Sequence, residues 1–233
     1  MSVSHLLRAT RNVIVSVRTA VLVSLVIPVP AFAQACLGTP SGGGVAYDYL
    51  RYSIGKGNGA TAAVRAGHLA LGANFGTRST SPVSSGAGGG GRIGAVIPIW
   101  KFEFCPNLGG SYYGNTWNAS NNATIKNSEF TVRGGAGLGI EQHVFKGIYL
   151  IPSMGLHYEF TAIKFDVTAP GAKVTTTGDT LHHVAVDVAL LLRYRFIYGG
   201  ASARRFTDGQ GPRAAVSRFI IGVALGSPPK RTG

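Results

Sequence analysis

Apolar and polar residues alternate one by one through long stretches of this chain. In the clearest stretch, residues 128–160, a charged or small face with Glu129 and Arg133 alternates with an apolar face with Phe130 and Val132. Successive side chains of a β-strand point to opposite faces, so a period of two predicts strands, and a short break midway predicts a hairpin. Each arm is longer than an ordinary strand of about 5 or 6 residues and reaches the roughly 9–11 residues that cross a bilayer at a tilt.

The same alternation predicts eight long strands in all. They cover residues 67–78, 92–97, 100–112, 129–143, 148–160, 182–193, 196–206 and 218–225. Polar segments over residues 77–91, 114–127, 163–178 and 207–214 predict long loops that alternate with short turns. Small outer-membrane barrels show this asymmetry. The sequence therefore predicts an all-β fold, an eight-stranded antiparallel transmembrane β-barrel.

One further stretch, residues 45–54, has strand propensity, but its apolar face switches partway. A β-bulge would explain the switch, or the segment lies outside the barrel wall. Counting it as a wall strand gives nine, an odd number for a single-chain bacterial barrel, and ten strands would need one more that the pattern does not reveal. We therefore expect eight wall strands, with ten as the alternative.

Charged residues fall on the polar face, which a membrane barrel turns toward its lumen. The expected lumen network contains Glu103, Glu129, Arg133, Glu141, Glu159, Asp187, Arg193 and Arg218, and Arg92, Lys101 and Arg205 are expected on the same face. An eight-stranded barrel is just wide enough for side chains to fill it, and buried charges must pair. An ion-pair network that seals the barrel is the first interpretation, and a narrow or gated pore lined by the same charges is the second.

The N-terminus has the features of an export signal. Arginines precede an apolar run, and Ala31-Phe32-Ala33 forms a small-x-small cleavage site. The expected organisation is a signal peptide over residues 1–33, an N-terminal segment over 34–61, a barrel over 62–226 and a C-terminal tail over 227–233. A membrane anchor is the rival interpretation of the leader, but its apolar run is short for a spanning helix.

The chain has two cysteines, Cys36 and Cys105. Export delivers them to an oxidising compartment, so we expect a disulfide that ties the N-terminal segment to the barrel. Acylation of Cys36 is the alternative, because this residue follows the leader closely.

Composition narrows the function. The formal net charge is +13, yet charged residues make up only 13% of the chain. A positive balance favours anionic partners, but the basic residues are scattered along strands, which disfavours nucleic acid and leaves anionic lipid headgroups. His182 and His183 are neighbours on one strand and so point to opposite faces, which disfavours a metal site there. His182 is expected beside Tyr158, Phe160 and Trp117 in an aromatic girdle.

Segments such as Arg133-Gly134-Gly135-Ala136-Gly137-Leu138-Gly139-Ile140-Glu141, with their repeated Gly-x-Gly pattern, resemble the small outer-membrane β-barrel families of opacity-protein type. The resemblance covers roughly residues 62–226 and lies in the pattern of the strands. The chain departs from such proteins in its last strand, which lacks a terminal aromatic residue.

The expected function is therefore that of a non-enzymatic, monomeric outer-membrane barrel. It would need no cofactor or metal, and it would contact outer-membrane lipids and lipopolysaccharide while its loops meet host or environmental surface ligands. A narrow passive pore is the alternative. A lipid-A-modifying barrel enzyme and a soluble lipocalin-like binder, which would turn the apolar face inward, are less favoured.

Overall fold

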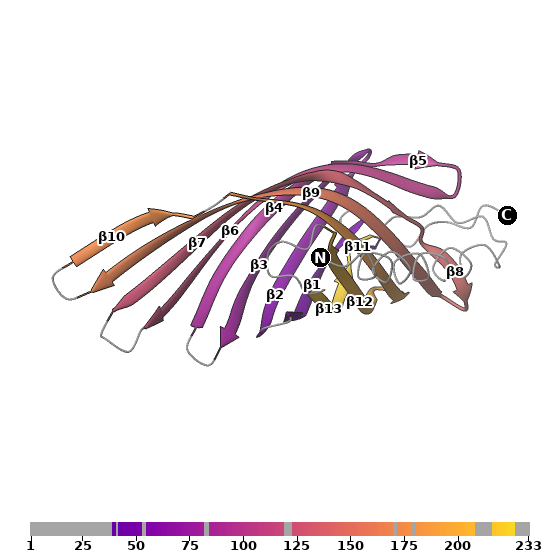
Figure 1. The fold of residues 1–233 in the computed structure, drawn as a ribbon. Coiled ribbons are helices and arrows are strands. Elements are labelled where there is room, and N and C mark those ends of the chain that lie inside the picture. The colour runs from indigo at the N-terminus through magenta and orange to yellow at the C-terminus, as the bar shows by residue number, and fades with distance from the viewer. Residues whose placement is uncertain are drawn as a thin grey trace, which may run out of the picture.

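The structure is a computed structural model that describes residues 39–40, 42–52, 55–81, 84–118, 123–169, 172–178, 180–207 and 216–226. These residues form thirteen β-strands (Figure 1). The strands are β1 (Gly43–Tyr52), β2 (Gly55–Ala66), β3 (Leu69–Ser81), β4 (Ser84–Ala95), β5 (Ile97–Ile99), β6 (Phe102–Asn118), β7 (Thr124–Gly139), β8 (Gln142–Phe145), β9 (Ile148–Ala169), β10 (Ala172–Thr177), β11 (Leu181–Tyr194), β12 (Ile197–Phe206) and β13 (Val216–Ala224).

Ten of these strands form a closed antiparallel barrel. The pairing runs β1-β2-β3-β4-β6-β7-β9-β11-β12-β13, and β13 pairs with β1 to close the ring. At one end of the barrel, the short strand β5 follows β4 and pairs with β6, and the short strand β8 follows β7 and pairs with β9. The remaining strand, β10, pairs with the far part of β9 at the other end, as Figure 1 shows.

The eight-strand count is therefore wrong, because β1 and β2 are also wall strands. The register of β1 against β13 is continuous from Gly44 to Arg51, so no bulge explains its change of face. Instead, Leu50 points inward near the rim of the lumen, where an apolar residue breaks the alternation. Strand β2 was not among the eight predicted strands, because glycine, alanine and asparagine dominate its first half, yet it pairs along its length with β1 and β3.

Most of the expected long loops are strands as well. Their serine, threonine and glycine residues lack the apolar alternation of a lipid-facing strand, but their backbone is paired. Strand β6 runs to Asn118, and β9 has 22 residues and reaches Ala169. Polar residues can occupy both faces of these strand ends because they extend past the apolar part of the barrel.

The predicted hairpin of residues 128–160 is confirmed. Strand β7 pairs with β9 from Thr124 to Gly139, and β8 keeps the same alignment as far as His143, after which the register shifts by one residue at Phe145. The long arms bring charged and aromatic residues of both strands into the same rows.

Four two-residue turns mark one end of the barrel, which we call the turn end; the opposite end is the loop end. A residue in the left-handed region sits in each turn: Gly67, Trp100, Gly147 and Arg195. Strand β1 begins at the turn end and β13 ends there, where Gly44 of β1 pairs with Ala224 of β13.

The apolar face points out. On β1, Val45 and Tyr47 are 49% and 53% exposed, whereas Ala46 and Asp48 between and beside them are 3% and 4% exposed. Large apolar side chains alternate outward in the same way on the other wall strands, including Leu156 on β9 and Ile221 on β13. A lipocalin-like arrangement would place these side chains inside, so the structure contradicts it. None of the described residues forms a helix that is long and apolar enough to cross a membrane.

The inside of the barrel is packed at the turn end. Ile151, Leu191 and Tyr198 form one buried cluster with Ala46, Ile220 and Ala224, and a second cluster joins Ala70, Val96 and Cys105. The first cluster comes from the consecutive strands β9, β11, β12, β13 and β1, and the second comes from the wall between β3 and β6, so buried side chains line both walls at this level.

Candidate functional site

The candidate site is a cavity in the lumen toward the loop end, with a volume of about 570 Å³. Its walls come from all ten barrel strands, and none of the residues of the two buried turn-end clusters lines it. A ten-stranded barrel is wider than the eight-stranded one expected from the sequence, which leaves this space. Five arginines and four carboxylates line the cavity: Arg78, Arg92, Arg133, Arg204, Arg218, Asp48, Glu129, Glu159 and Asp187.

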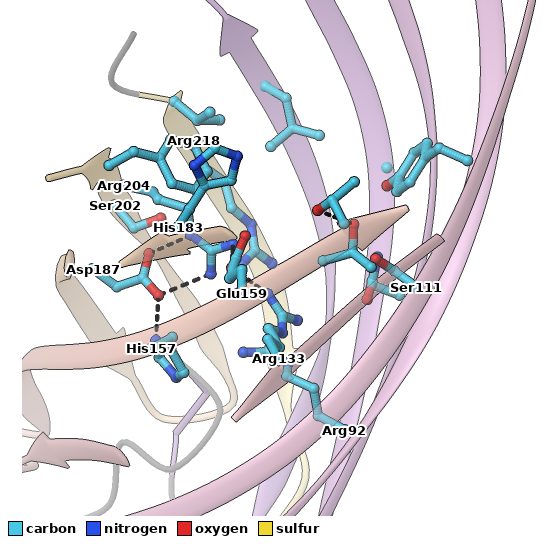
Figure 2. A pocket seen from close by; sticks show the side chains of 18 of the residues that line it. Arg92, Ser111, Arg133, His157, Glu159, His183, Asp187, Ser202, Arg204 and Arg218 are labelled. Carbon is cyan, nitrogen blue, oxygen red and sulfur yellow. Dashed lines mark hydrogen bonds and ion pairs between the residues drawn. The ribbon is translucent and has the colours of Figure 1, made fainter. Parts of the chain in front are cut away.

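Arg204 of β12 is the centre of a group that we call the lumen cluster, with Asp187, Glu159, His157 and Arg133 (Figure 2). Its Nε and Nη2 donate to the two carboxylate oxygens of Asp187 at 2.6 and 2.9 Å, and its Nη1 donates to Glu159 Oε1 at 2.6 Å. Planar two-point contacts of this kind are the strong form of an arginine–carboxylate pair. Asp187 Oδ2 also lies 3.1 Å from His157 Nδ1, and Glu159 Oε1 lies 4.0 Å from Arg133 Nη1.

A second group, the seam triad, joins the strands that close the barrel. Arg218 of β13 lies 2.7 Å from Asp48 Oδ1 of β1, and Thr61 of β2 donates to Asp48 Oδ2 at 2.5 Å. Arg218 Nη2 also donates to Thr61 Oγ1 at 2.8 Å. The triad therefore connects β13, β1 and β2 through side chains across the seam.

Two ion pairs lie at the turn end, outside the cavity. Glu141 and Arg193 have fully buried side chains, and Arg193 Nη1 lies 3.2 Å from Glu141 Oε1. Arg193 also donates to the backbone carbonyls of Arg195 and Gly226, at 2.8 and 2.6 Å. The second pair joins Glu103 of β6 to Arg65 of β2 at 2.8 Å.

The predicted lumen residues therefore lie in five places rather than in one network. Glu159, Arg133 and Asp187 are together in the lumen cluster, and Arg218 belongs to the seam triad. Glu141 pairs with Arg193, and Glu103 pairs with Arg65. Glu129 lies near the loop end, where it contacts Arg78 at 3.1 Å.

Three sequence expectations about this face are wrong. Arg205 is exposed on the outside of β12, and its neighbour Arg204 occupies the lumen. Lys101 lies in a turn against the ring of Trp100. Trp117 lines the cavity, so it is not in a girdle with His182.

Sequence reasoning missed Asp48, Arg65, Arg78 and Arg204. Asp48 and Arg65 lie in the two strands that were not assigned to the wall. Arg78 was expected at the end of a strand, on its polar face, but was not included in the lumen network. A count of ten strands would have placed Asp48 and Arg65 in the wall.

His182 and His183 point to opposite faces, as expected. The exposed His182 bonds with the hydroxyl of Tyr158 at 2.7 Å and packs edge-on against Phe160, whereas His183 is buried in the lumen. Among the residues with described positions, no group of three or more His, Cys, Asp or Glu is arranged to hold a metal ion.

Cys105 is buried in the lumen at the turn end, beside Val96 and Ala70. Cys36 and the predicted signal peptide lie outside the described residues, as does the C-terminal tail. The disulfide therefore stays a prediction.

Comparisons with known proteins supply a fold likeness but no family. No family model matches the chain, and no curated protein does. Among solved structures, the translocator domain of autotransporter NalP from Neisseria meningitidis is similar at a TM-score of 0.45 and 13% identity, over 94% of this chain and 97% of that one.

Proposed function

We propose that this protein is a monomeric outer-membrane β-barrel with a structural and surface-contact role and no catalytic centre. The observation that carries the proposal is the apolar outer face of a closed barrel. A closed barrel pairs all of its strands, which is what a sheet needs in lipid, and its long strands suffice to span the bilayer. Monomeric soluble proteins rarely expose apolar surface that is continuous around the molecule.

The outer face changes character toward the loop end, which supports contact with anionic lipid headgroups. On β7 and β9 the apolar rows end near Phe130 and Phe160, and the next outward positions include Lys126 and Lys164. Lys173 of the neighbouring β10 has the same orientation, two residues from Thr175, which faces Asp166 across the pair. Lysines just outside an apolar band attract phosphate-bearing lipids, among which lipopolysaccharide is our expected partner.

The lumen favours a closed barrel over the alternative of a passive pore. Two clusters of buried side chains line the turn end, and the fully buried pair of Glu141 and Arg193 lies in the same region. A continuous water path would need these groups to separate. We therefore propose that the cavity is closed toward the turn end and that the barrel does not conduct.

The ion pairs of the carboxylates in the cavity support a non-enzymatic role. The carboxylates that line the cavity, those of Asp48, Glu129, Glu159 and Asp187, all contact arginines. A carboxylate held by arginine is a weak general base, because the cation stabilises its ionised form. Adhesion through the loops remains part of the proposal.

The first test is cell fractionation followed by gel electrophoresis of heated and unheated samples. We expect the protein in the outer membrane, with a mobility that changes on heating. Recovery as a soluble periplasmic protein would overturn the proposal. Planar-bilayer recordings of the folded protein test the closed lumen, and regular single-channel steps would establish the pore instead.

One substitution in the outer apolar band and one beyond it test the contact of the band with lipid. Leu156 lies in the apolar band of β9, and Val174 lies on β10 beyond it; their exposed fractions are 57% and 60%. A lipid-facing arginine costs about 2–4 kcal/mol near the bilayer midplane and far less near the interface. We expect L156R to reduce folding into vesicles and V174R to leave it unchanged. Equal folding of both variants would contradict a lipid-facing band.

A further inference from the structure

The arginines that line the cavity outnumber the carboxylates that line it. Five arginines and four carboxylates line it, so the lining carries one excess positive charge with its histidines neutral. The wall formed by β4, β6 and β7 contributes two arginines, Arg92 and Arg133, and one carboxylate, Glu129, so the excess lies on this wall. The other three carboxylates, Asp48, Glu159 and Asp187, balance the three arginines of the remaining strands. A wall with an excess of positive charge attracts anions.

Arg92 and Arg133 converge on this wall across a bare position. Arg92 of β4 pairs with Gly109 of β6, and Gly109 pairs in turn with Arg133 of β7. A Cβ placed on Gly109 would lie 2.6 Å from Arg92 Cγ and 3.5 Å from Arg133 Nε. The glycine thus lets both side chains lie over the same strand, and Figure 2 shows them directed into the lumen toward Glu159.

Among the cavity arginines with described ion pairs, Arg133 has the longest contact with a carboxylate. Its ion-pair contact is with Glu159 Oε1 at 4.0 Å, the same oxygen that Arg204 contacts at 2.6 Å. Its side chain is 16% exposed, so water screens it only partly. Arg92 and Arg133 are like charges that lie close together, and Arg133 shares its acid with Arg204, which is closer to it. An added anion would stabilise this arrangement.

We propose that the lumen cavity binds the phosphoryl group of a small solute or a lipid headgroup, with Arg133 as the main contact and Arg92 beside it. Guanidinium groups match phosphate oxygens in two-point geometry, and two of them side by side can share one phosphate. Ser111, which lines the cavity near these arginines, adds a hydroxyl donor. A volume of about 570 Å³ lies within the usual range for small-molecule sites.

The test is calorimetric titration of inorganic phosphate into the full-length protein, folded in uncharged detergent micelles at constant ionic strength. We expect saturable binding at one site and a loss of affinity of about tenfold or more in R133Q. The matched control is R205Q, which removes the same charge from the outer face of β12. Its affinity should equal that of the wild type.

A second variant tests whether loss of the acid that contacts Arg133 raises the affinity for phosphate. E159Q removes the acid that Arg133 and Arg204 share, so we expect it to bind phosphate more tightly than the wild type. Unchanged heat-dependent mobility shows that each variant has folded. The proposal is wrong if wild-type protein shows no saturable binding, or if R133Q and R205Q behave alike.

Two further titrations identify the source of the phosphate. Glycerol 3-phosphate represents a soluble solute, and micelles doped with phosphatidylglycerol present the same group on a lipid. An Arg133-dependent signal with the first ligand points to a solute, and one confined to the second points to a lipid headgroup. The measurements are made in detergent and depend on the cavity alone, so their failure would leave the proposed membrane location untouched, and failed fractionation would leave the phosphate site untouched.

Discussion

The buried pair of Glu141 and Arg193 allows the sharpest test of what holds the turn end together. Both side chains are fully buried, and their charged atoms are 3.2 Å apart. At that separation the attraction is about 5 kcal/mol for an effective dielectric constant of about 20. Removing both charges from water offsets much of this gain, so the pair as a whole adds little. Losing only one partner is different, because the other charge remains buried.

We therefore expect E141A to lower the free energy of unfolding by about 3–5 kcal/mol. The measurement is denaturant unfolding in detergent micelles, followed by tryptophan fluorescence. D166N is the control, because Asp166 belongs to a solvent-screened pair with Lys164 at 3.7 Å, and such surface pairs contribute little to stability.

The double variant E141Q/R193M separates charge from packing. Replacing a buried ion pair with neutral or apolar groups is often close to neutral. Here we expect only partial recovery relative to E141A, because the carbonyls of Arg195 and Gly226 would lose the donors that Arg193 supplies. A loss below about 0.5 kcal/mol in E141A would refute the reasoning, since it would mean that water or another group compensates Arg193 at no cost.

Three further predictions address the seam, the wall and the loop end. D48A should cost about 2–4 kcal/mol and reduce the heat-dependent mobility shift, because this buried acid joins the strands that close the barrel; unfolding titrations measure it. G135A should cost about 1–3 kcal/mol and G134A far less, because a Cβ on Gly135 would lie against the backbone of the facing strand, whereas one on Gly134 meets its nearest atom at 3.6 Å; the same titrations compare them. The pKa of Asp166 lies below its usual value because the Thr175 hydroxyl donates a hydrogen bond to the carboxylate. The contribution of Asp166 to stability is therefore present above the usual carboxyl pKa and is lost as the pH falls through the lowered pKa. NMR titration of T175V should show that the pKa of Asp166 has risen.

The sequence was sufficient to predict the strands with an apolar outer face but not the number of strands in the barrel. The hairpin of β7 and β9 could be predicted because large apolar residues alternate with charges along both arms. Strand β2 could not, because small residues such as Ala60 and Ala62 occupy its outer face. These positions are exposed, and Val64 is the one large apolar side chain on that face of the strand. A hydrophobic period identifies a strand only where large apolar side chains recur on one of its faces.

The composition of the lumen groups was less predictable because it depends on register. Arg204 and Arg205 are adjacent arginines, and a shift of one residue in the pairing of β12 would exchange them between lumen and exterior. Nothing in the local pattern decides between them; the pairing of Asp187 with Arg204 does. Asp48 and Arg218 are even further apart in sequence, and only closure of the ring brings β1 next to β13. Because closure also determines the barrel width, the error of two strands hid both the seam triad and the cavity: an interior of eight strands would have been filled by the same side chains that leave space in a ring of ten.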